Sequence, residues 1–147
     1  LILGINMQTR PEEIYRALIE ATAFGLRVIL ENYEAYGVSI GDICAAGGIA
    51  MKNPMLMQIY ADVLNQSIGI CQSTQAGALG SAIYAAVAAG VYPDFAAAAE
   101  AMGTPVSKYY HPSPENHAAY QKLYEEYVRL HDYFGRGGND VMHRLHK

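Results

Sequence analysis

The pattern of apolar and polar positions along the chain separates long helical stretches from short apolar runs. From residue 11 to residue 36, apolar or small residues recur at helical spacing and predict one buried face, formed by Ile14, Leu18, Ala21, Gly25 and Val28. Thr9-Arg10-Pro11-Glu12 has the form of a capping box that opens this helix, and Gly37 follows its expected end. The triplet Leu1–Leu3 before it is strand-like.

Two short apolar runs farther along predict strands. Ile40 and residues 43–46 form a nearly all-apolar segment, as expected of a strand buried on both faces, and residues 67–71 form another. Helices are expected after each strand and again toward the C-terminus, over residues 55–64, 76–89, 93–102, 114–134 and 141–147. The aromatic face of the long C-terminal helix, Tyr120 to Phe134, is expected to pin it to the domain. These elements predict a mixed α/β domain in which helix dominates.

Composition and charge restrict the function classes. Hydrophobic residues make up 52% of the 147, which is typical of a globular domain with a core. The formal charge is -4 and no Lys/Arg cluster is present, so a nucleic-acid surface is not expected. No apolar run is long enough to cross a membrane, and the start has no initiator Met and no secretory signal. We therefore expect a cytoplasmic protein, and a chain cut from a longer polypeptide.

The cysteines and histidines do not suggest a reactive site. Cys44 and Cys71 each lie in a predicted buried strand without a polar activating neighbour, so reduced core thiols are expected rather than a disulfide or a catalytic thiol. His143 and His146 have the spacing of two ligands on one helix face, but no third ligand accompanies them, so we expect no metal site.

The candidate chemistry lies in the turn after the first predicted strand. Gly47 and Gly48 have no Cβ, so a ligand can approach their main-chain N–H groups closely. Asn53 suits a helix N-cap and Pro54 the first helical position. A glycine turn that leads into a helix N-terminus is suited to phosphate or ribose. The same residues also fit a tight strand-to-helix turn with no ligand, and both interpretations stay open on this pattern alone.

Other nucleotide and hydrolase motifs are absent from the sequence. It contains no G-x-G-x-x-G after a strand, no G-x-x-x-x-G-K-[ST] and no G-x-S-x-G. Asp42 precedes the strand and Asp62 lies far along the helix, so neither is placed as a general base beside the turn. The pattern therefore predicts a nucleotide-cradling turn without a catalytic group.

Several motifs resemble those of the FGGY carbohydrate kinases. Residues 47–64, with Gly47-Gly48-Ile49-Ala50 and Lys52-Asn53-Pro54, are similar to the adenosine motif of that family, and residues 73–82 are similar to the segment that follows it. The tail at residues 130–142 and the helix at residues 11–25 resemble the branch of the family that acts on L-ribulose. The resemblance extends over essentially the whole chain.

The resemblance implies an actin-like, RNase H-like ATPase fold, with residues 1–147 forming part of the C-terminal, nucleotide-binding domain. It implies ATP with Mg²⁺, and it places Gly47 and Gly48 along the α-phosphate and ribose, with Asn53 or Lys52 near the adenosine. The catalytic aspartate, the sugar-binding residues and the loops for the β- and γ-phosphates belong to sequence upstream. The parent protein would phosphorylate L-ribulose to L-ribulose 5-phosphate, and this chain alone would be inactive.

Two other functions stay open at this point. One is a non-catalytic actin-like module that senses sugar or serves as a scaffold. The other is a different small-molecule enzyme that binds a phosphorylated cofactor at the glycine turn. Self-association into a homo-oligomer is also left open, and the surface expected to drive it is the helix at residues 76–89 or the face bared by the missing strands.

Overall fold

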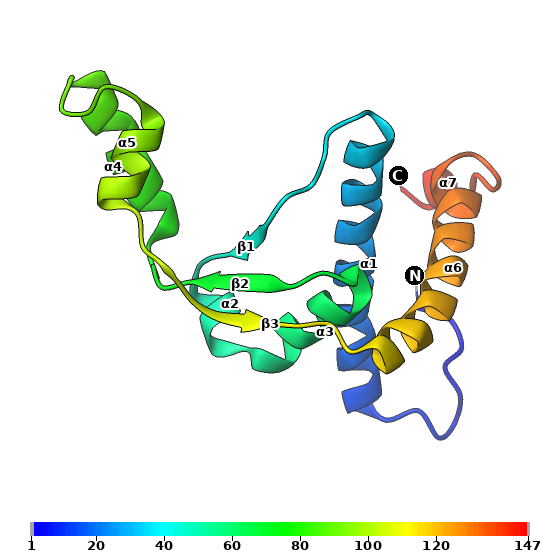
Figure 1. The fold of residues 1–147 in the computed structure, drawn as a ribbon. Helices are drawn as coiled ribbons and strands as arrows, with labels where there is room; N and C mark the ends of the chain where they lie inside the picture. The colour runs from blue at the N-terminus through cyan, green and yellow to red at the C-terminus, as the bar shows by residue number, and fades with distance from the viewer. Residues whose placement is uncertain (1, 147) are drawn as a thin grey trace. The chain divides into compact units, whose positions relative to one another are not determined.

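The computed structural model describes residues 2–146, which form two compact units (Figure 1). Unit 1 takes in Leu1–Ile40, Ile59–Asn65 and Pro112–Lys147, and unit 2 takes in Gly41–Gln58 and Gln66–His111. The elements in chain order are α1 (Pro11–Ala35), β1 (Ile43–Ala45), α2 (Gly48–Lys52), α3 (Pro54–Leu64), β2 (Ile68–Cys71), α4 (Ala76–Ala88), α5 (Phe95–Met102), β3 (Val106–Tyr110), α6 (Pro114–Gly135) and α7 (Val141–Leu145). The helix-dominated α/β class is as predicted.

Unit 1 is built on the packing of α1 against α6. The ring of Phe24 lies 5.9 Å from that of Tyr124 and 5.5 Å from that of Tyr127, measured between centroids. The guanidinium of Arg27 lies 4.0 Å over the Tyr124 ring, and its Nη2 donates to Gln121. The aromatic face of α6 thus holds α1, as the sequence predicted.

The buried face of α1 differs from the predicted one. The buried residues are Ile19, Ala23 and Phe24, whereas Leu18 is 53% exposed and Ala21 is also exposed. Apolar residues occur around most of this helix, so periodicity alone does not select a face. The α6 rings select the side that carries Phe24, because a large aromatic side chain buries much apolar area when it packs against other rings.

The start of α1 is shifted by one residue from the prediction. Arg10 is the N-cap, and its main-chain N–H donates to Glu13 Oε2 at 2.8 Å. Thr9 Oγ1 instead accepts from Asn6 N. Pro11 accounts for the shift, because proline is favoured at the first helical position and this places the cap at Arg10. Ile2 and Leu3 are in no strand, contrary to the prediction, and residue 1 lies outside the described residues.

A buried carboxylate connects α3 to the start of α6. Asp62 is 2% exposed, and its Oδ1 accepts from Ser113 N at 2.8 Å while Oδ2 accepts from Asn116 Nδ2 at 2.9 Å. Ser113 is the N-cap of α6, and its hydroxyl accepts from Asn116 N. Asp62 therefore has a structural role in unit 1.

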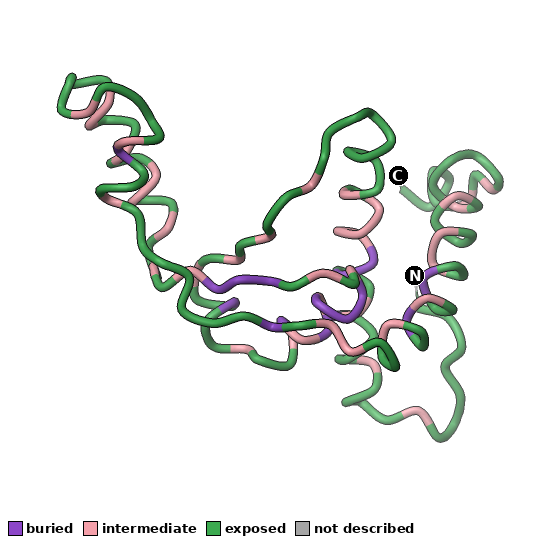
Figure 2. The backbone as a smooth tube through the Cα atoms, in the orientation of Figure 1, coloured by how far each residue is buried: buried purple, intermediate pink, exposed green. Residues whose placement is uncertain are grey.

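Unit 2 contains a three-stranded sheet in the order β1-β2-β3 (Figure 1). Strand β1 pairs with β2 in parallel, with Ala45 opposite Ile70, and β2 pairs with β3 in antiparallel. The central strand β2 is buried at Ile68, Gly69 and Ile70, as Figure 2 shows. Strand β1 lies at the sheet edge and has no buried residue, so the expectation that it is buried on both faces was wrong.

Strand β3 was not predicted, because four of its five residues are exposed and leave no apolar alternation to detect. The close approach of β3 to β2 depends on a glycine. A Cβ on Gly69 would lie 2.9 Å from Val106 Cγ1 and 3.2 Å from Tyr109 Cε1. Only glycine leaves room at that position without a shift of β3.

A disulfide joins Cys44 of β1 to Cys71 of β2, with the Cα atoms 6.5 Å apart. The expectation of reduced thiols was therefore wrong. Each cysteine was correctly placed in a strand. The parallel pairing of β1 with β2 brings the two side chains together, and this register cannot be predicted from either strand alone.

Helices α4 and α5 pack on each other, with the rings of Tyr84 and Phe95 4.8 Å apart. Helix α4 has no buried residue, although most of its sequence is apolar. No helix within residues 2–146 is both long and apolar enough to cross a membrane.

Candidate functional site

The glycine turn after β1 is open. Gly47 has φ 93° and ψ 176°, a backbone conformation reserved largely for glycine. Gly48 is exposed and begins α2. A Cβ on either glycine would meet no atom within 4 Å. The main chain of this turn is therefore accessible to a ligand, and no packed side chain covers it.

The amides at the start of α2 are the donors that the turn offers. The first helical bond runs from Met51 N to Gly47 O at 3.3 Å, so the N–H groups of Gly48, Ile49 and Ala50 precede any partner within the helix. Helix α2 has only five residues, so these local amides matter more than a helix dipole. The sequence predicted one helix after the turn, and the separate α2 was missed.

Asn53 lies at the junction of α2 and α3. Its main-chain N–H donates to Ile49 O at 3.0 Å and ends α2, and its Oδ1 accepts from Leu56 N at 3.0 Å and caps α3. The predicted capping role is confirmed. The cap uses the oxygen of the carboxamide, and the Nδ2 donor has no hydrogen bond to any of the described residues.

Lys52 is the last residue of α2 and is exposed. Within residues 2–146 its ammonium forms no ion pair. The turn therefore carries two side-chain donors next to each other in sequence, the Lys52 ammonium and Asn53 Nδ2. Both follow the amides of the turn within five residues of the sequence.

Parallel pairing brings a second loop to the same end of the sheet. Since β1 and β2 run in the same direction and Ala45 pairs with Ile70, the turns that follow the two strands begin at the same end of the sheet, the carboxyl end of both strands. The second turn contains Ser73, whose hydroxyl accepts from Gln75 N at 3.2 Å, and it leads into α4. Residues 73–82, which the sequence linked to the glycine turn through family resemblance, thus begin beside that turn.

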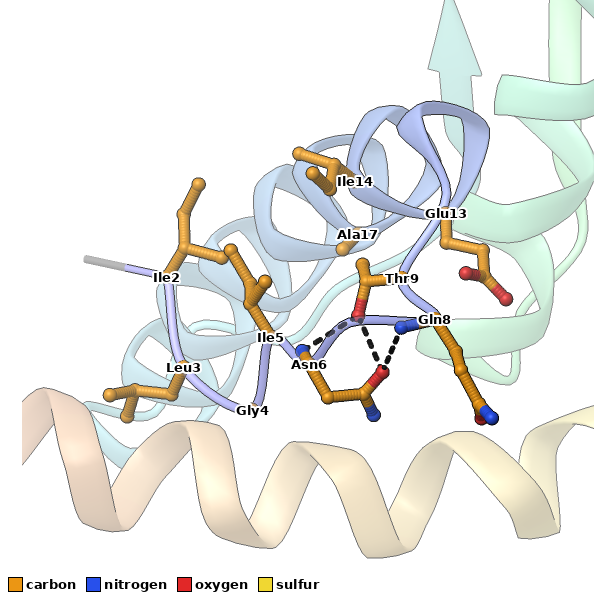
Figure 3. Close-up of a pocket in the computed structure, with 10 residues that line it drawn as sticks. All are labelled: Ile2, Leu3, Gly4, Ile5, Asn6, Gln8, Thr9, Glu13, Ile14 and Ala17. Atoms are coloured by element: carbon orange, nitrogen blue, oxygen red, sulfur yellow. Dashed lines mark hydrogen bonds between the residues drawn. The ribbon is translucent and has the colours of Figure 1, made fainter.

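The hollows of unit 1 are lined by residues of that unit. One, of about 390 Å³, is formed where residues 2–9 fold back on the first turns of α1, and it contains the Asn6–Thr9 turn (Figure 3). Another, of about 680 Å³, lies between α1, α6 and α7 and is lined mainly by apolar side chains. Neither is lined by the four candidate residues. The candidate site is an open turn.

The perturbed tyrosines also belong to unit 1. Burial raises the pKa of Tyr124, and the neighbouring Glu31 carboxylate, which accepts its hydroxyl hydrogen bond, raises it further. Burial likewise raises the pKa of Tyr120, against an opposing hydrogen bond from Arg16. These groups fix the packing of α1 on α6.

Metal-binding groups do not gather in the described part of the chain. Within residues 2–146 no three His, Cys, Asp or Glu side chains are placed to hold one ion. His143 lies on α7 and His146 just after it.

A family of known proteins matches more than half of the chain. The model of the C-terminal domain of the FGGY family of carbohydrate kinases matches residues 1–89. The ribulokinase of Halalkalibacterium halodurans is 52% identical over 149 residues, an alignment that covers 99% of this chain and 26% of the relative. The chain thus spans about a quarter of the length of the curated relatives it matches.

Solved structures share the fold. A xylulose kinase from Rhodospirillum rubrum matches with a TM-score of 0.72 at 23% identity, over 87% of this chain and 26% of that one. A Plasmodium falciparum glycerol kinase with ADP matches with a TM-score of 0.67 at 21% identity, over 88% of this chain and 26% of that one. At these identities the match establishes the fold, the actin-like ATPase fold of the sugar kinases.

Proposed function

The chain belongs to the FGGY family of carbohydrate kinases, and we propose that it is the C-terminal, adenine-nucleotide-binding part of an ATP-dependent kinase that phosphorylates L-ribulose. The observation that carries the nucleotide assignment is the bare turn at Gly47 and Gly48, where no side chain blocks approach to the main-chain amides. The ribulose assignment is supported by the ribulokinases that match over 99% of the chain. These matches favour a kinase over a non-catalytic sensor or scaffold.

In this proposal the amides of the glycine turn bind the α-phosphate and ribose. Phosphate oxygens suit main-chain donors that have no other partner, and the absence of a Cβ lets them come close. Lys52 or Asn53 Nδ2 lies near the adenosine. Mg²⁺ arrives with the nucleotide and is held mainly by its phosphates and by residues outside this chain, since the described residues lack a ligand cluster.

The reaction itself needs groups that, in this proposal, lie outside the described residues. Phosphoryl transfer relies on positioning and on neutralising charge around the γ-phosphate, together with a base for the sugar hydroxyl. Asp62, the one buried carboxylate identified among the described residues, is engaged by Ser113 and Asn116. We therefore propose that this chain alone is inactive and binds nucleotide weakly. A coupled assay with L-ribulose, ATP and Mg²⁺ should show no turnover, and turnover would contradict this point.

Nucleotide binding is tested by titrating the ¹⁵N-labelled chain with ADP at millimolar concentration. The expected result is a set of amide shifts confined to residues 47–53. The variant Gly48→Val places a branched side chain in the open space and should abolish these shifts. Gly41→Val is the matched control, because Gly41 is also exposed with nothing within 4 Å of a Cβ, and it should leave the titration unchanged. If ADP shifts no amide of the turn, the proposal fails.

The choice between Lys52 and Asn53 has its own test. Asn53→Asp keeps an oxygen to cap α3 but removes the Nδ2 donor, and Lys52→Met removes the ammonium while keeping the stem. If Asn53 contacts the adenosine, Asn53→Asp weakens the ADP titration and Lys52→Met does not. The reverse result assigns the contact to Lys52.

The setting of the protein completes the proposal. We propose a cytoplasmic enzyme, because its substrates are ATP and a free sugar. The sugar would be bound by the N-terminal domain of the longer parent. Sedimentation of the chain at several concentrations tests whether it forms a homo-oligomer.

A further inference from the structure

The disulfide occupies a particular position relative to the candidate site. Cys44 is the middle residue of β1 and precedes Gly47 by three positions, and Cys71 ends β2 just before the second turn. The disulfide therefore joins β1 to β2 near their carboxyl ends, where both turns of the site begin. All four candidate residues, Gly47, Gly48, Lys52 and Asn53, lie inside the loop that it closes, which has a sequence separation of 27.

We infer that the Cys44–Cys71 pair is a reversible redox switch that controls the order of the Gly47-Gly48 turn, an inference that rests on the nucleotide binding proposed for that turn. In the oxidised form the turn is held in its open conformation, ready for a nucleotide. In the dithiol form β1 is freer, the turn is less ordered, and nucleotide binding weakens because the turn must first be ordered.

The attachment of β1 to the sheet depends on the disulfide more than that of a buried strand would. Strand β1 has three residues, none of which is buried, and among residues 2–146 it pairs with β2 alone. Its attachment therefore consists of a short ladder to β2 together with the sulfur–sulfur bond. Short edge segments with few buried contacts open locally at low free-energy cost. Loss of the disulfide would therefore increase local opening mainly in β1 and the turn after it.

The exchange chemistry is accessible from solvent. Cys44 is exposed and Cys71 is half-buried. The thiolate of a low-molecular-weight thiol attacks Cys44 Sγ, the sulfur–sulfur bond breaks, and Cys71 leaves as a thiolate that takes up a proton. A second thiolate attacks the mixed disulfide, releases Cys44 as a thiol and leaves as the low-molecular-weight disulfide. Two electrons and two protons reach the protein, and the same disulfide as oxidant reverses both steps.

The proposed cellular setting points to regulation rather than to a permanent bond. Disulfides in cytosolic proteins are rare, and those that occur are usually transient and catalytic or redox-sensing. A pair of cysteines that is accessible, close enough to bond and next to a candidate ligand site fits that description.

The test compares the oxidised chain, the dithiol chain and the variant with both Cys44→Ser and Cys71→Ser. Each is equilibrated in glutathione buffers of stepped redox poise, and free thiols are counted before amide hydrogen exchange is measured over residues 45–53. We expect a reversible two-electron transition, and exchange about fivefold faster in the dithiol form, the factor that corresponds to freeing about one backbone residue. The serine variant should match the dithiol form at every poise.

Four results separate this inference from the proposed function. Free thiols at every poise, or equal exchange in the two forms, would overturn the switch whatever ADP does. An ADP titration of equal strength in the two forms would overturn the control of binding and leave the nucleotide site standing. If ADP fails to shift the turn of the oxidised chain, the proposed function fails, and the inferred control of binding fails with it.

Discussion

Replacing Asp62 with alanine should destabilise unit 1 more than a typical surface substitution. The carboxylate is 2% exposed and accepts hydrogen bonds from the Ser113 amide and the Asn116 side chain, 51 and 54 residues away in sequence. Asp62→Ala leaves both donors without their charged acceptor. It also removes a negative charge from the N-terminus of α6, where the helix dipole favours one.

The size of the effect follows from the exposure of the donors. Hydrogen bonds to a charged group contribute roughly 1.5 to 3 kcal/mol each, and an abandoned buried donor costs that order of free energy. Asn116 is exposed and can bond to water instead, whereas the Ser113 amide is partly buried. We therefore expect a loss of about 3 kcal/mol, which lowers Tm by roughly 6 to 12 °C for a chain of this length.

The assay is urea denaturation followed by circular dichroism, with thermal melts alongside. Glu115→Ala is the matched control, because Glu115 is an exposed carboxylate in the first turn of α6 and shares only the dipole effect. It should cost under about 1 kcal/mol. If Asp62→Ala and Glu115→Ala shift the denaturation midpoint equally, the assignment of Asp62 as a buried anchor is wrong.

Three further outcomes are expected. The pKa of Tyr124 is raised above 10.0 by burial and by Glu31, so above pH 10 the native state keeps a proton that the unfolded chain releases. The stability contributed by this group should be full below pH 10 and fall as the pH rises above it. Tyr124→Phe should make the fall above pH 10 shallower in urea titrations. An equally steep fall in the variant would contradict this. Gly69→Ala should cost about 1 to 3 kcal/mol, because its Cβ would lie 2.9 Å from Val106 Cγ1, and a variant as stable as the parent would show that β3 adjusts freely. The unburied apolar surface of α4 should make the chain self-associate, so light scattering that shows a monomer at high concentration would count against it.

The parts of the fold that local chemistry controls could be predicted from the sequence. The starts of α3 and α6 follow from Asn53-Pro54 and Ser113-Pro114, and α4 spans almost the range expected of it. A cap or a proline acts on the residues next to it, so its effect is visible in a short window. The glycine turn was found for the same reason.

The parts that depend on distant partners could not be predicted. The buried face of α1 is selected by rings on α6, about a hundred residues away, and the disulfide requires the register of β1 on β2. Strand β3 carries no apolar alternation, because four of its five residues meet solvent. In the candidate site, the four residues remain a prediction from the sequence, and the break between α2 and α3, which gives Asn53 two roles, was missed.

The pairing of β2 with β3 places the two ends of the segment between them next to each other. Cys71 and Val106 are opposite each other in the ladder, and Gln72 N donates to Pro105 O at 3.4 Å, so residues 72–105 leave the sheet and return to it at neighbouring points. The α4–α5 pair is thus part of a connection that begins and ends at neighbouring points of the sheet. A shorter or longer connection would still place β3 in the same position beside β2. The length of this segment can therefore vary among related chains without a change in the sheet.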